Sequence, residues 1–370
     1  MRILRVAQNL YPEVPGGGTY HVHAMSRDQA AMGHDVTVLT VSGDESLPRR
    51  EERDGYSVVR RRPTVEVLGN QISAGVSRFL RNAGDFDVIH AHSHLYFSTN
   101  LAAVHHIDGV PLAITNHGLY SQNAPEWLFD LYLRTVGRWT FNQADVVFCY
   151  TEEDRKRVRE FGVNSRIEVI PNGVDTERFT PDGEVSGTID HDGPVVLFVG
   201  RLVGGKQPKD AIDAMSRLPE KVDAKLYVVG DGPLRSELET RRNQDIVEFL
   251  GQISYEKMPE VYRAGDVLLL PSRAEGLPRT VLEAMSSDVP VVVSELEQVA
   301  PVVDGAGVTV PVGDINGFAE GIETMLDDSF EDPRTVVEDK FDWTNTVERT
   351  TTTLAELTNE FDRKSATTEQ

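Results

Sequence analysis

The chain has 370 residues, of which 39% are hydrophobic, and its formal net charge is −22 at pH 7. This length exceeds that of one ordinary domain and predicts two. The single cysteine, Cys149, excludes an intrachain disulfide and favours a reducing compartment, and the apolar runs are shorter than the roughly 20 residues that span a bilayer. We therefore expect a cytoplasmic protein, and no nucleic-acid partner.

The charge is unevenly distributed along the chain. Residues 1–180 hold 19 basic and 22 acidic side chains, whereas residues 181–370 hold 18 and 37. The acid excess indicates either adaptation to molar salt or an ordinary acidic surface. The first half also contains an arginine cluster, namely Arg49, Arg50, Arg53, Arg60, Arg61 and Arg62. This cluster predicts either peripheral contact with the inner face of an anionic membrane or a solvated surface, and both interpretations stay open.

Short apolar runs alternate with helical patterns from the start of the chain. The first strand is expected at 3–10, a helix at 19–33 and a second strand at 34–41. Further β-rich runs lie at 86–92, 111–117, 145–151 and 166–173. Such alternation is typical of a parallel sheet that helices cover on both faces.

A segment rich in Gly, Pro, Asp and Ser, residues 180–194, interrupts the alternation and predicts a linker. Strands are then expected at 195–200, 224–230, 247–251, 266–272 and 289–294, with a helix at 278–287 among them. The predicted fold class is α/β, with two doubly wound Rossmann-like domains facing across a cleft. We expect domains at 1–183 and 184–345, and a C-terminal helix at 346–370 that crosses back to the first domain.

Three glycines, Gly16, Gly17 and Gly18, lie between the first strand and the first helix. Glycine lets a backbone approach a ligand closely, and a helix N-terminus attracts an anion. The segment does not fit G-x-G-x-x-G, and no acidic residue ends the second strand, so a dinucleotide site is disfavoured. A glycine-rich turn without a ligand is the alternative.

The loop from Gly200 to Lys206 fits the first seven positions of the phosphate-loop pattern G-x-x-x-x-G-K-[ST]. Gln207 then stands where a hydroxyl residue would hold Mg²⁺, so a phosphate-loop NTPase is disfavoured. Arg201 and Lys206 still offer donors that suit a diphosphate. The alternative is a basic surface loop without a ligand.

Histidines lie at the ends of two predicted strands. His90, His92 and His94 alternate along one of them, a spacing that would suit a metal. No carboxylate or cysteine cluster accompanies them, so we expect no metal site; we expect one of the three to face the cleft and the others to be packed or solvated. His117 follows another strand and is expected on the ligand side.

Two carboxylates, Glu275 and Glu283, flank a predicted helix start at Pro278. Free N–H groups at a helix start can bind phosphate without a metal, and carboxylates accept hydrogen bonds from vicinal hydroxyls. A ligand with hydroxyls on both sides of a phosphate fits this order, which predicts a nucleotide sugar. The alternative is that both glutamates are solvated helix charges.

The chain resembles the retaining glycosyltransferase family 4, which has the GT-B fold, from the first strand to about residue 345. The segments VGRLVGGK, VVGDGPLRSEL, VEFLGQIS, VYRAGDVLLLPSRAEGLPRTVLEAM and VPVVVS occur in the family's order and spacing. Glu275 and Glu283 match its E-x7-E signature.

The resemblance implies a role for each site residue. Glu283 would bind the ribose hydroxyls of the donor and Glu275 its sugar hydroxyls. Arg201 and Lys206 would hold the diphosphate and stabilise the leaving group. The predicted catalytic residues are Glu275, Arg201, Lys206 and His117. Of these, His117 would face the donor sugar. The other predicted donor-binding residues are Glu283, Gly16, Gly17, Gly18, Gly276, Leu277, Pro278, Arg279 and Asn172.

The resemblance further implies transfer of a hexose-type sugar from a UDP-, GDP- or similar donor to a glycan, glycolipid or lipid-linked acceptor, with retention and without a metal or other cofactor. The absence of an obvious nucleophile favours front-face substitution. After VPVVVS the family has a Gly-Gly turn, whereas this chain has ELEQVAPVV, which leaves the donor contacts of that loop open. A nucleotide-sugar epimerase of the same architecture and a non-catalytic binding subunit are the alternative functions.

Overall fold

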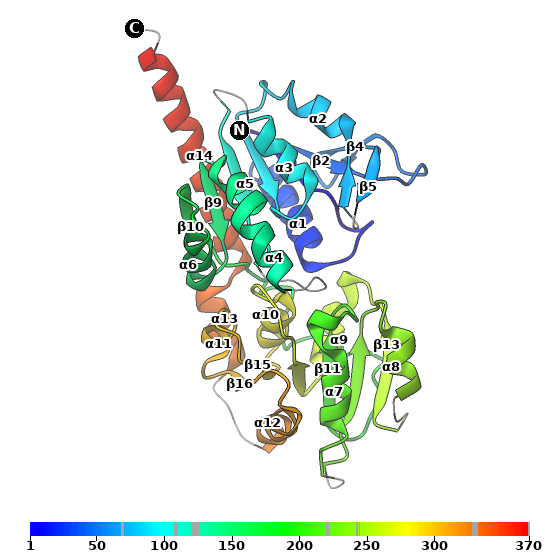
Figure 1. Ribbon diagram of the computed structural model, residues 1–370. Helices are drawn as coiled ribbons and strands as arrows, with labels where there is room; N and C mark the ends of the chain where they lie inside the picture. The colour runs from blue at the N-terminus through cyan, green and yellow to red at the C-terminus, as the bar shows by residue number, and fades with distance from the viewer. Residues whose placement is uncertain are drawn as a thin grey trace. The chain divides into compact units, whose positions relative to one another are not determined.

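The protein is described from a computed structural model, which covers residues 1–67, 70–106, 110–119, 126–219, 222–241, 243, 245–327 and 332–368 (Figure 1). The chain divides into two compact units. The first comprises Met1–Leu119, Trp127–Ile170 and Thr346–Gln370, and the second comprises Tyr120–Glu126 and Pro171–Asn345. Each unit is described by itself.

The first unit contains a sheet with the strand order β10-β9-β8-β7-β1-β2-β4-β3. Its strands are β1 (Arg2–Val6), β2 (Asp35–Val41), β3 (Arg50–Arg53), β4 (Tyr56–Arg61), β7 (Val88–His92), β8 (Leu112–Thr115), β9 (Val146–Cys149) and β10 (Arg166–Val169). The neighbours pair in parallel, except that β3 and β4 are antiparallel. β5 (Val65–Val67) and β6 (Asn70–Ile72) form a separate two-stranded ribbon.

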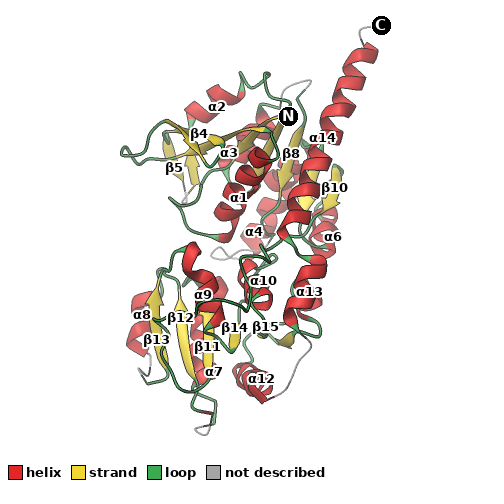
Figure 2. Ribbon diagram, turned by 180° about the vertical axis from the view of Figure 1, so that it is seen from behind, coloured by secondary structure: helices red, strands yellow, loops and turns green. Residues whose placement is uncertain are grey.

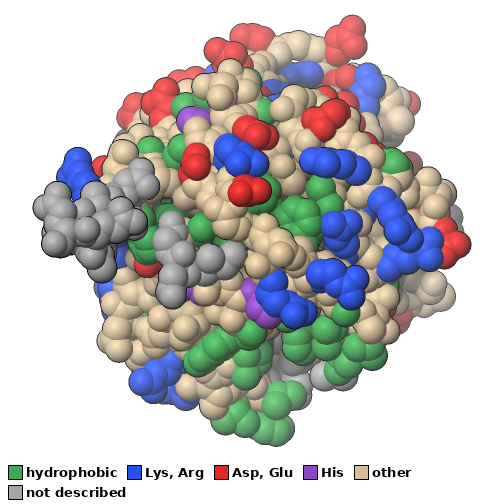
Figure 3. Space-filling model, turned by 90° about the horizontal axis from the view of Figure 1, so that it is seen from above, with side chains coloured by type: hydrophobic (Ala, Val, Ile, Leu, Met, Phe, Trp, Pro, Cys, Tyr) green, Lys and Arg blue, Asp and Glu red, His purple; other side chains and the backbone are tan. Residues whose placement is uncertain are grey.

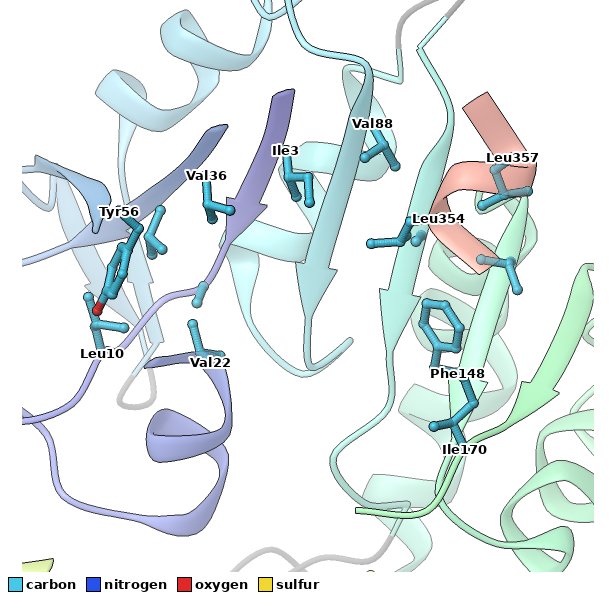
Figure 4. Close-up of a cluster of buried hydrophobic side chains, with 14 of the residues drawn as sticks. Ile3, Leu10, Val22, Val36, Tyr56, Val88, Phe148, Ile170, Leu354 and Leu357 are labelled. Atoms are coloured by element: carbon cyan, nitrogen blue, oxygen red, sulfur yellow. The ribbon is translucent and has the colours of Figure 1, made fainter. Parts of the chain in front are cut away.

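Helices cover this sheet and complete its core. They are α1 (Gly17–Ala31), α2 (Ala74–Leu80), α3 (Phe97–Val104), α4 (Glu126–Tyr132), a π-helical turn (Leu133–Gly137), α5 (Arg138–Asn142), α6 (Glu152–Glu160) and α14 (Trp343–Thr368). α1 and α14 lie on the same side of the sheet (Figure 2), and Val22 and Leu354 belong to one buried cluster with Ile3 and Phe148 (Figure 4). The C-terminal helix is therefore part of the first unit's core.

The second unit contains a parallel sheet with the order β13-β12-β11-β14-β15-β16. The strands are β11 (Val195–Val199), β12 (Lys225–Val229), β13 (Val247–Gly251), β14 (Val267–Leu270), β15 (Val291–Ser294) and β16 (Gly307–Val310). The helices are α7 (Pro208–Met215), α8 (Arg235–Arg241), α9 (Met258–Arg263), α10 (Arg279–Ser286), α11 (Ala300–Val303), α12 (Ile315–Asp327) and α13 (Pro333–Lys340), with 3-10 turns at Gly204–Lys206 and Tyr255–Lys257. The central strands are buried along their whole length, as the apolar runs predicted.

The prediction of two α/β domains with parallel sheets is confirmed, and three details differ. α1 begins at Gly17, so two of the three glycines are helical. β3 and β4 were not predicted, because charged residues dominate residues 50–61 and conceal the strand pattern. The chain passes from the first unit to the second after Ile170, whereas the first domain was expected to continue to residue 183. The segment after Ile170 packs on the second unit. There Phe179 is fully buried, and its ring centroid lies 5.6 Å from that of Tyr255.

Candidate functional site

Two loops meet beyond the carboxyl ends of the neighbouring strands β11 and β14. The first contains Lys206 and the second contains Glu275, and the Lys206 ammonium donates to Glu275 Oε1 over 2.6 Å. The backbone N–H of Arg273 also donates to the carbonyl of Gly205 over 3.0 Å. Only 17% of the Lys206 side chain and 8% of the Glu275 side chain are exposed. The pair is therefore a partly desolvated ion pair that holds the two loops together.

Glycines of the loop after β12 make room for the lysine loop. A Cβ at Gly230 would lie 2.0 Å from the carbonyl oxygen of Gly200, and one at Gly232 would lie 2.5 Å from that of Leu202. No side chain fits at such distances, so the segment VVGDG needs glycine at both positions. Arg201, between the two carbonyls, is exposed at this sheet end.

Helix α10 starts close to Glu275. Pro278 is its N-cap, with an extended ψ of 116°, and Arg279 is its first helical residue. This corrects the expected helix start at Pro278 by one residue. Gly276 is partly exposed, whereas Leu277 and Pro278 are buried, so the loop packs against the sheet end before the helix begins. Glu283 lies in the second turn and is 4% exposed.

The Glu283 carboxylate is held inside the unit by two tyrosines. Tyr255 donates to Oε1 over 3.0 Å and Tyr262 donates to Oε2 over 2.9 Å. The Arg279 guanidinium is 3.4 Å from Oε1. Burial raises the pKa of Glu283, and the charge of Arg279 and the tyrosine hydroxyls oppose that rise. The carboxylate is thus buried and hydrogen-bonded, and the prediction had not included its tyrosine partners.

The Arg279 side chain joins helix α10 to two other segments of the second unit. Its Nη1 donates to the carbonyl of Gly173 over 3.1 Å, and its Nη2 donates to the Tyr255 hydroxyl over 2.9 Å. These bonds bring the PNGVD segment to α10, so Asn172, which is buried, lies in the second unit with the glutamates.

Gln298 belongs to the segment ELEQVAPVV, where the family resemblance predicted a Gly-Gly turn. Its side chain is 2% exposed, and Nε2 donates to the carbonyl oxygen of Glu275 over 2.5 Å. The hydroxyls of Ser272, Thr280 and Ser294, which follow β14, open α10 and end β15, are buried without a hydrogen-bond partner in the described part of the chain. This sheet end therefore combines a positioned carboxylate with polar groups that can accept further partners.

The first unit gathers a second group of predicted residues. A Cβ at Gly18 would lie 3.5 Å from Nδ1 of His117, so the glycine segment packs directly on that imidazole. Gly16 has φ 157°, which an L side chain rarely adopts, and Gly17 and Gly18 form the first turn of α1. Beneath them, His92 contacts His117 Nε2 at 3.0 Å and Tyr150 contacts its Nδ1 at 2.9 Å.

The arginine cluster is only partly available to a membrane. The Arg60 side chain is 5% exposed, and its Nη2 lies 2.5 Å from Glu13 and 2.9 Å from Glu51. Arg53 binds the same two carboxylates. These two arginines belong to a partly buried ion-pair network within the unit, which corrects the expectation that Arg60 is available for contact with a membrane. Arg49 and Arg50 are exposed, Arg62 pairs with Glu45, and Arg61 is partly exposed.

Two further properties of the described residues bear on function. None of the helices in the described ranges combines the length and the apolar character needed to cross a membrane. In the same ranges, the His, Cys, Asp and Glu side chains form no group of three or more that could hold a metal ion.

Comparison with known proteins identifies the family. Residues 15–178 match the model of Glycosyltransferase Family 4, and residues 193–328 match that of Glycosyl transferases group 1. The GDP-mannose-dependent alpha-(1-6)-phosphatidylinositol monomannoside mannosyltransferase of Mycolicibacterium smegmatis is 31% identical over 88% of this chain and 88% of its own. The chain belongs to glycosyltransferase family 4.

Other known proteins agree with this assignment. A glycogen synthase of Mycobacterium tuberculosis is 28% identical over 89% of this chain and 86% of its own. The solved structure of sucrose-phosphate synthase from Thermosynechococcus elongatus matches this glycosyltransferase with a TM-score of 0.83 at 21% identity, covering 96% and 98% of the two chains. Anabaena HepE in complex with UDP-glucose gives a TM-score of 0.77 at 21% identity, with 96% and 100% covered. These structural matches establish the GT-B fold.

Proposed function

We propose that this glycosyltransferase moves a hexose-type sugar from a nucleotide-sugar donor to a glycan, glycolipid or lipid-linked acceptor, with retention of configuration. The observation that carries the proposal is the ion pair of Lys206 and Glu275 beside the start of α10. A cation for a diphosphate and a carboxylate for sugar hydroxyls are joined at one sheet end. We infer surface-polysaccharide or glycoprotein-glycan biosynthesis as the process.

The donor would lie along this sheet end. Lys206 and Arg201 would bind the diphosphate together with the backbone N–H groups of Leu277 and Arg279. Glu275 would accept hydrogen bonds from the sugar. Glu283 would bind the ribose through Oε2, which accepts from Tyr262 and has a second lone-pair site, whereas Oε1 already faces both Tyr255 and Arg279.

The first unit holds the remaining residues that we propose for donor binding. We assign the donor-sugar contact to His117 and the close backbone approach to Gly16, Gly17 and Gly18. The contact of Gly18 with the His117 ring, where an added Cβ would lie 3.5 Å from Nδ1, supports placing the glycine segment beside that histidine.

The proposed chemistry is front-face substitution. The bond between the anomeric carbon and the phosphate oxygen breaks while the acceptor oxygen bonds to that carbon on the same face, and the departing phosphate oxygen takes the acceptor's proton. Arg201, Lys206 and the α10 N-terminus would stabilise the charge that develops on the phosphate. A trapped covalent glycosyl-enzyme would contradict this mechanism. A rate that EDTA abolishes and Mg²⁺ restores would contradict its metal independence.

Thermal shift in molar KCl tests the donor assignment across UDP-, GDP-, ADP- and dTDP-sugars. A bound donor at about 100 times its Kd adds about 2.7 kcal/mol of stability. We expect one donor to stabilise the wild type and to have no effect on Lys206→Ala or Glu283→Ala. Lys225→Ala is the matched control, because Lys225 forms a 2.6 Å pair with Glu248 elsewhere in the unit. The absence of a shift with every donor would favour the non-catalytic binding subunit.

Product analysis separates transfer from epimerisation. With the identified donor, a transferase releases nucleoside diphosphate only in proportion to glycosylated acceptor. An epimerase releases altered sugar without any acceptor. Lipid-linked and soluble glycan acceptors are compared in the same assay, and the named lipid acceptor of the mycobacterial relative makes the lipid-linked class the first to test.

We also propose peripheral contact with the inner face of an anionic membrane, at a cytoplasmic location. Exposed Trp127, Leu131 and Trp139, within 126–142, support it, since Trp favours the membrane interface. Basic and hydrophobic side chains adjoin on the face in Figure 3.

Liposome flotation with anionic lipid tests this membrane contact. The double variant Arg61→Glu with Arg62→Glu should float less than the wild type. Arg155→Glu with Lys156→Glu on α6 is the charge-matched control, and equal flotation of both would remove the arginine argument.

A further inference from the structure

Three side chains from three strand ends of the first unit form a hydrogen-bonded row. His92 ends β7, His117 follows β8 and Tyr150 follows β9. His92 Nδ1 lies 3.0 Å from His117 Nε2, and the Tyr150 hydroxyl lies 2.9 Å from His117 Nδ1. His21 of α1 packs against the row, with its ring centroid 5.2 Å from that of His117. Both ring nitrogens of His117 are therefore engaged inside the protein.

The row permits two arrangements of protons, because each contact needs one donor and one acceptor. In the first, His92 Nδ1–H donates to His117 Nε2, and His117 Nδ1–H donates to the Tyr150 oxygen. In the second, the Tyr150 hydroxyl donates to His117 Nδ1, and His117 Nε2–H donates to His92 Nδ1. Neutral His117 carries its proton on Nδ1 in the first arrangement and on Nε2 in the second.

The surroundings of His92 decide between them. His92 is 2% exposed, and its Nε2 is buried without a hydrogen-bond partner among the described residues. In the second arrangement that nitrogen would carry an N–H, leaving a buried donor unsatisfied. In the first it carries only a lone pair. Orphaned buried N–H groups are rarer in proteins than under-used acceptors, so the first arrangement is favoured.

The environment also keeps the row uncharged. Burial lowers the pKa of His117 to about 4 and that of His92 well below its usual value. The titratable groups that face the two rings are His21 of α1, His90 of β7 and Tyr150, with Arg5 of β1 near His92 and His94 near His117. Burial alone lowers the pKa of His117, whereas the pKa of His92 is lowered first by burial and then by the neighbouring histidines and Arg5, all of which disfavour a second proton.

We propose that His92 and Tyr150 are positioning residues that hold His117 as the neutral Nδ1–H tautomer. The inference rests on the proposed function, in which His117 faces the donor sugar. In that site His117 presents no N–H from Nε2 and takes no part in proton transfer near neutral pH. Its task is to hold a fixed, uncharged ring beneath the glycine segment, and His92 and Tyr150 set its orientation.

The tautomer can be measured directly on the full chain labelled with ¹⁵N-histidine. Long-range ¹H–¹⁵N correlation distinguishes protonated from unprotonated ring nitrogens, and loss of the signal in His117→Gln assigns it. We expect protonated Nδ1 and bare Nε2 for His117 at pH 7.5. A protonated Nε2 would overturn the proposal. This readout needs no enzymatic activity, so it stands or fails apart from the proposed function.

Variants separate positioning from simple packing. His92→Phe should mix the two tautomers of His117, whereas His92→Asn, whose amide can donate from the place of Nδ1, should preserve the wild-type signal. His94→Leu is the control, because His94 is equally buried but no hydrogen bond joins it to His117 in the described structure. An unchanged tautomer in His92→Phe would overturn the role of His92.

With the donor identified, the acid limb of the kcat/KM profile gives a second readout. In His92→Phe it should move upward by about one pH unit, a tenfold loss at a fixed acidic pH, because the lost N–H donor no longer favours the neutral ring. His92→Asn should restore the wild-type profile. Coincident profiles for all three proteins would contradict the positioning role while leaving the transferase function intact.

Discussion

The Lys206 ammonium lies 2.6 Å from Glu275 Oε1, so the predicted diphosphate cation and the predicted sugar carboxylate are direct partners. An ammonium has three donors and can keep this carboxylate while it binds a phosphate. Glu275 therefore orients Lys206 and also attenuates its charge. We therefore expect the loss of Lys206 and the loss of Glu275 to have different effects on donor binding.

Binding of a nucleoside diphosphate without a sugar should separate the two roles. Lys206→Ala loses a charged hydrogen bond and should bind the diphosphate about tenfold to a hundredfold more weakly, corresponding to about 1.5–3 kcal/mol. Glu275→Gln leaves the lysine charge uncompensated and should retain or increase that affinity. Its sugar-transfer rate should nevertheless fall by about a hundredfold. Isothermal titration calorimetry and a transfer assay measure the two effects.

The ion pair of Lys225 and Glu248, also 2.6 Å long, provides the control for this comparison. Lys225→Ala should change neither diphosphate affinity nor transfer. Equal loss of diphosphate binding in Lys206→Ala and Glu275→Gln would show that the pair acts only as a structural clamp.

The second carboxylate, Glu283, depends on its tyrosines for stability. Tyr262→Phe removes the donor to Oε2 from a fully buried carboxylate, and we expect it to cost about 1–3 kcal/mol in urea unfolding. Tyr227→Phe is the control, because the buried Tyr227 donates to a neutral carbonyl, that of Asp190, over 2.9 Å. A smaller loss in Tyr262→Phe than in Tyr227→Phe would mean that Glu283 is protonated in the folded protein.

Local patterns predicted the parts of the site that depend on position along the chain. Lys206 and Glu275 each follow a predicted buried strand, and the carboxyl ends of parallel strands lie at one edge of a sheet, which is where the structure brings the two loops together. The helix start was predicted at Pro278, one residue before the observed start at Arg279. These features follow from backbone geometry, which neighbouring residues determine.

The partners of the site residues could not be predicted in the same way. Tyr262 reaches Glu283 across 21 positions, and Gln298 reaches Glu275 across 23. No local spacing encodes such contacts, which depend on how helices and loops pack. The same holds for Arg60, whose partner Glu13 lies 47 positions away, and for this reason the arginine cluster looked more exposed than it is.

Gln298 should affect the sugar end of the donor and not the diphosphate end. Gln298→Met keeps the side-chain length but cannot donate to the Glu275 carbonyl. We expect transfer to fall by about tenfold, which corresponds to about 1.4 kcal/mol, with nucleoside diphosphate affinity unchanged. Steady-state kinetics beside calorimetry test this. Equal losses in both measurements would show that Gln298 supports the whole loop and not Glu275 alone.

Gly232 should be essential for the shape of the lysine loop. In Gly232→Ala the new Cβ would lie 2.5 Å from the Leu202 carbonyl oxygen, and the backbone must shift, which costs about 1–3 kcal/mol. Gly204→Ala in the facing loop is the control, because nothing lies within 4 Å of its Cβ. Its stability should stay within about 0.5 kcal/mol of the wild type. Urea unfolding that ranks the two variants equally would contradict the close approach.

His94 should make the protein sensitive to acid. Its ring is fully buried between Tyr132 and Phe141, neither nitrogen has a hydrogen-bond partner among the described residues, and burial lowers its pKa to about 3. Since the unfolded residue has a pKa near 6.5, the unfolded state binds the proton first as the pH falls. The stability that neutral His94 contributes is therefore complete above about pH 6.5 and decreases from there toward pH 3, with a loss of about 2 kcal/mol by pH 5.

His94→Leu removes this titration. Between pH 7.5 and pH 5, the variant should lose about 2 kcal/mol less stability than the wild type in urea unfolding at molar KCl. At pH 7.5 the two proteins should differ by about 1 kcal/mol or less, because the lost ring contacts are offset by the removal of two unsatisfied nitrogens. His90, His92 and His117 stay in both proteins, so only the difference between the two pH curves reports on His94. Parallel curves would show that the His94 ring takes up its proton as readily in the folded protein as in the unfolded chain.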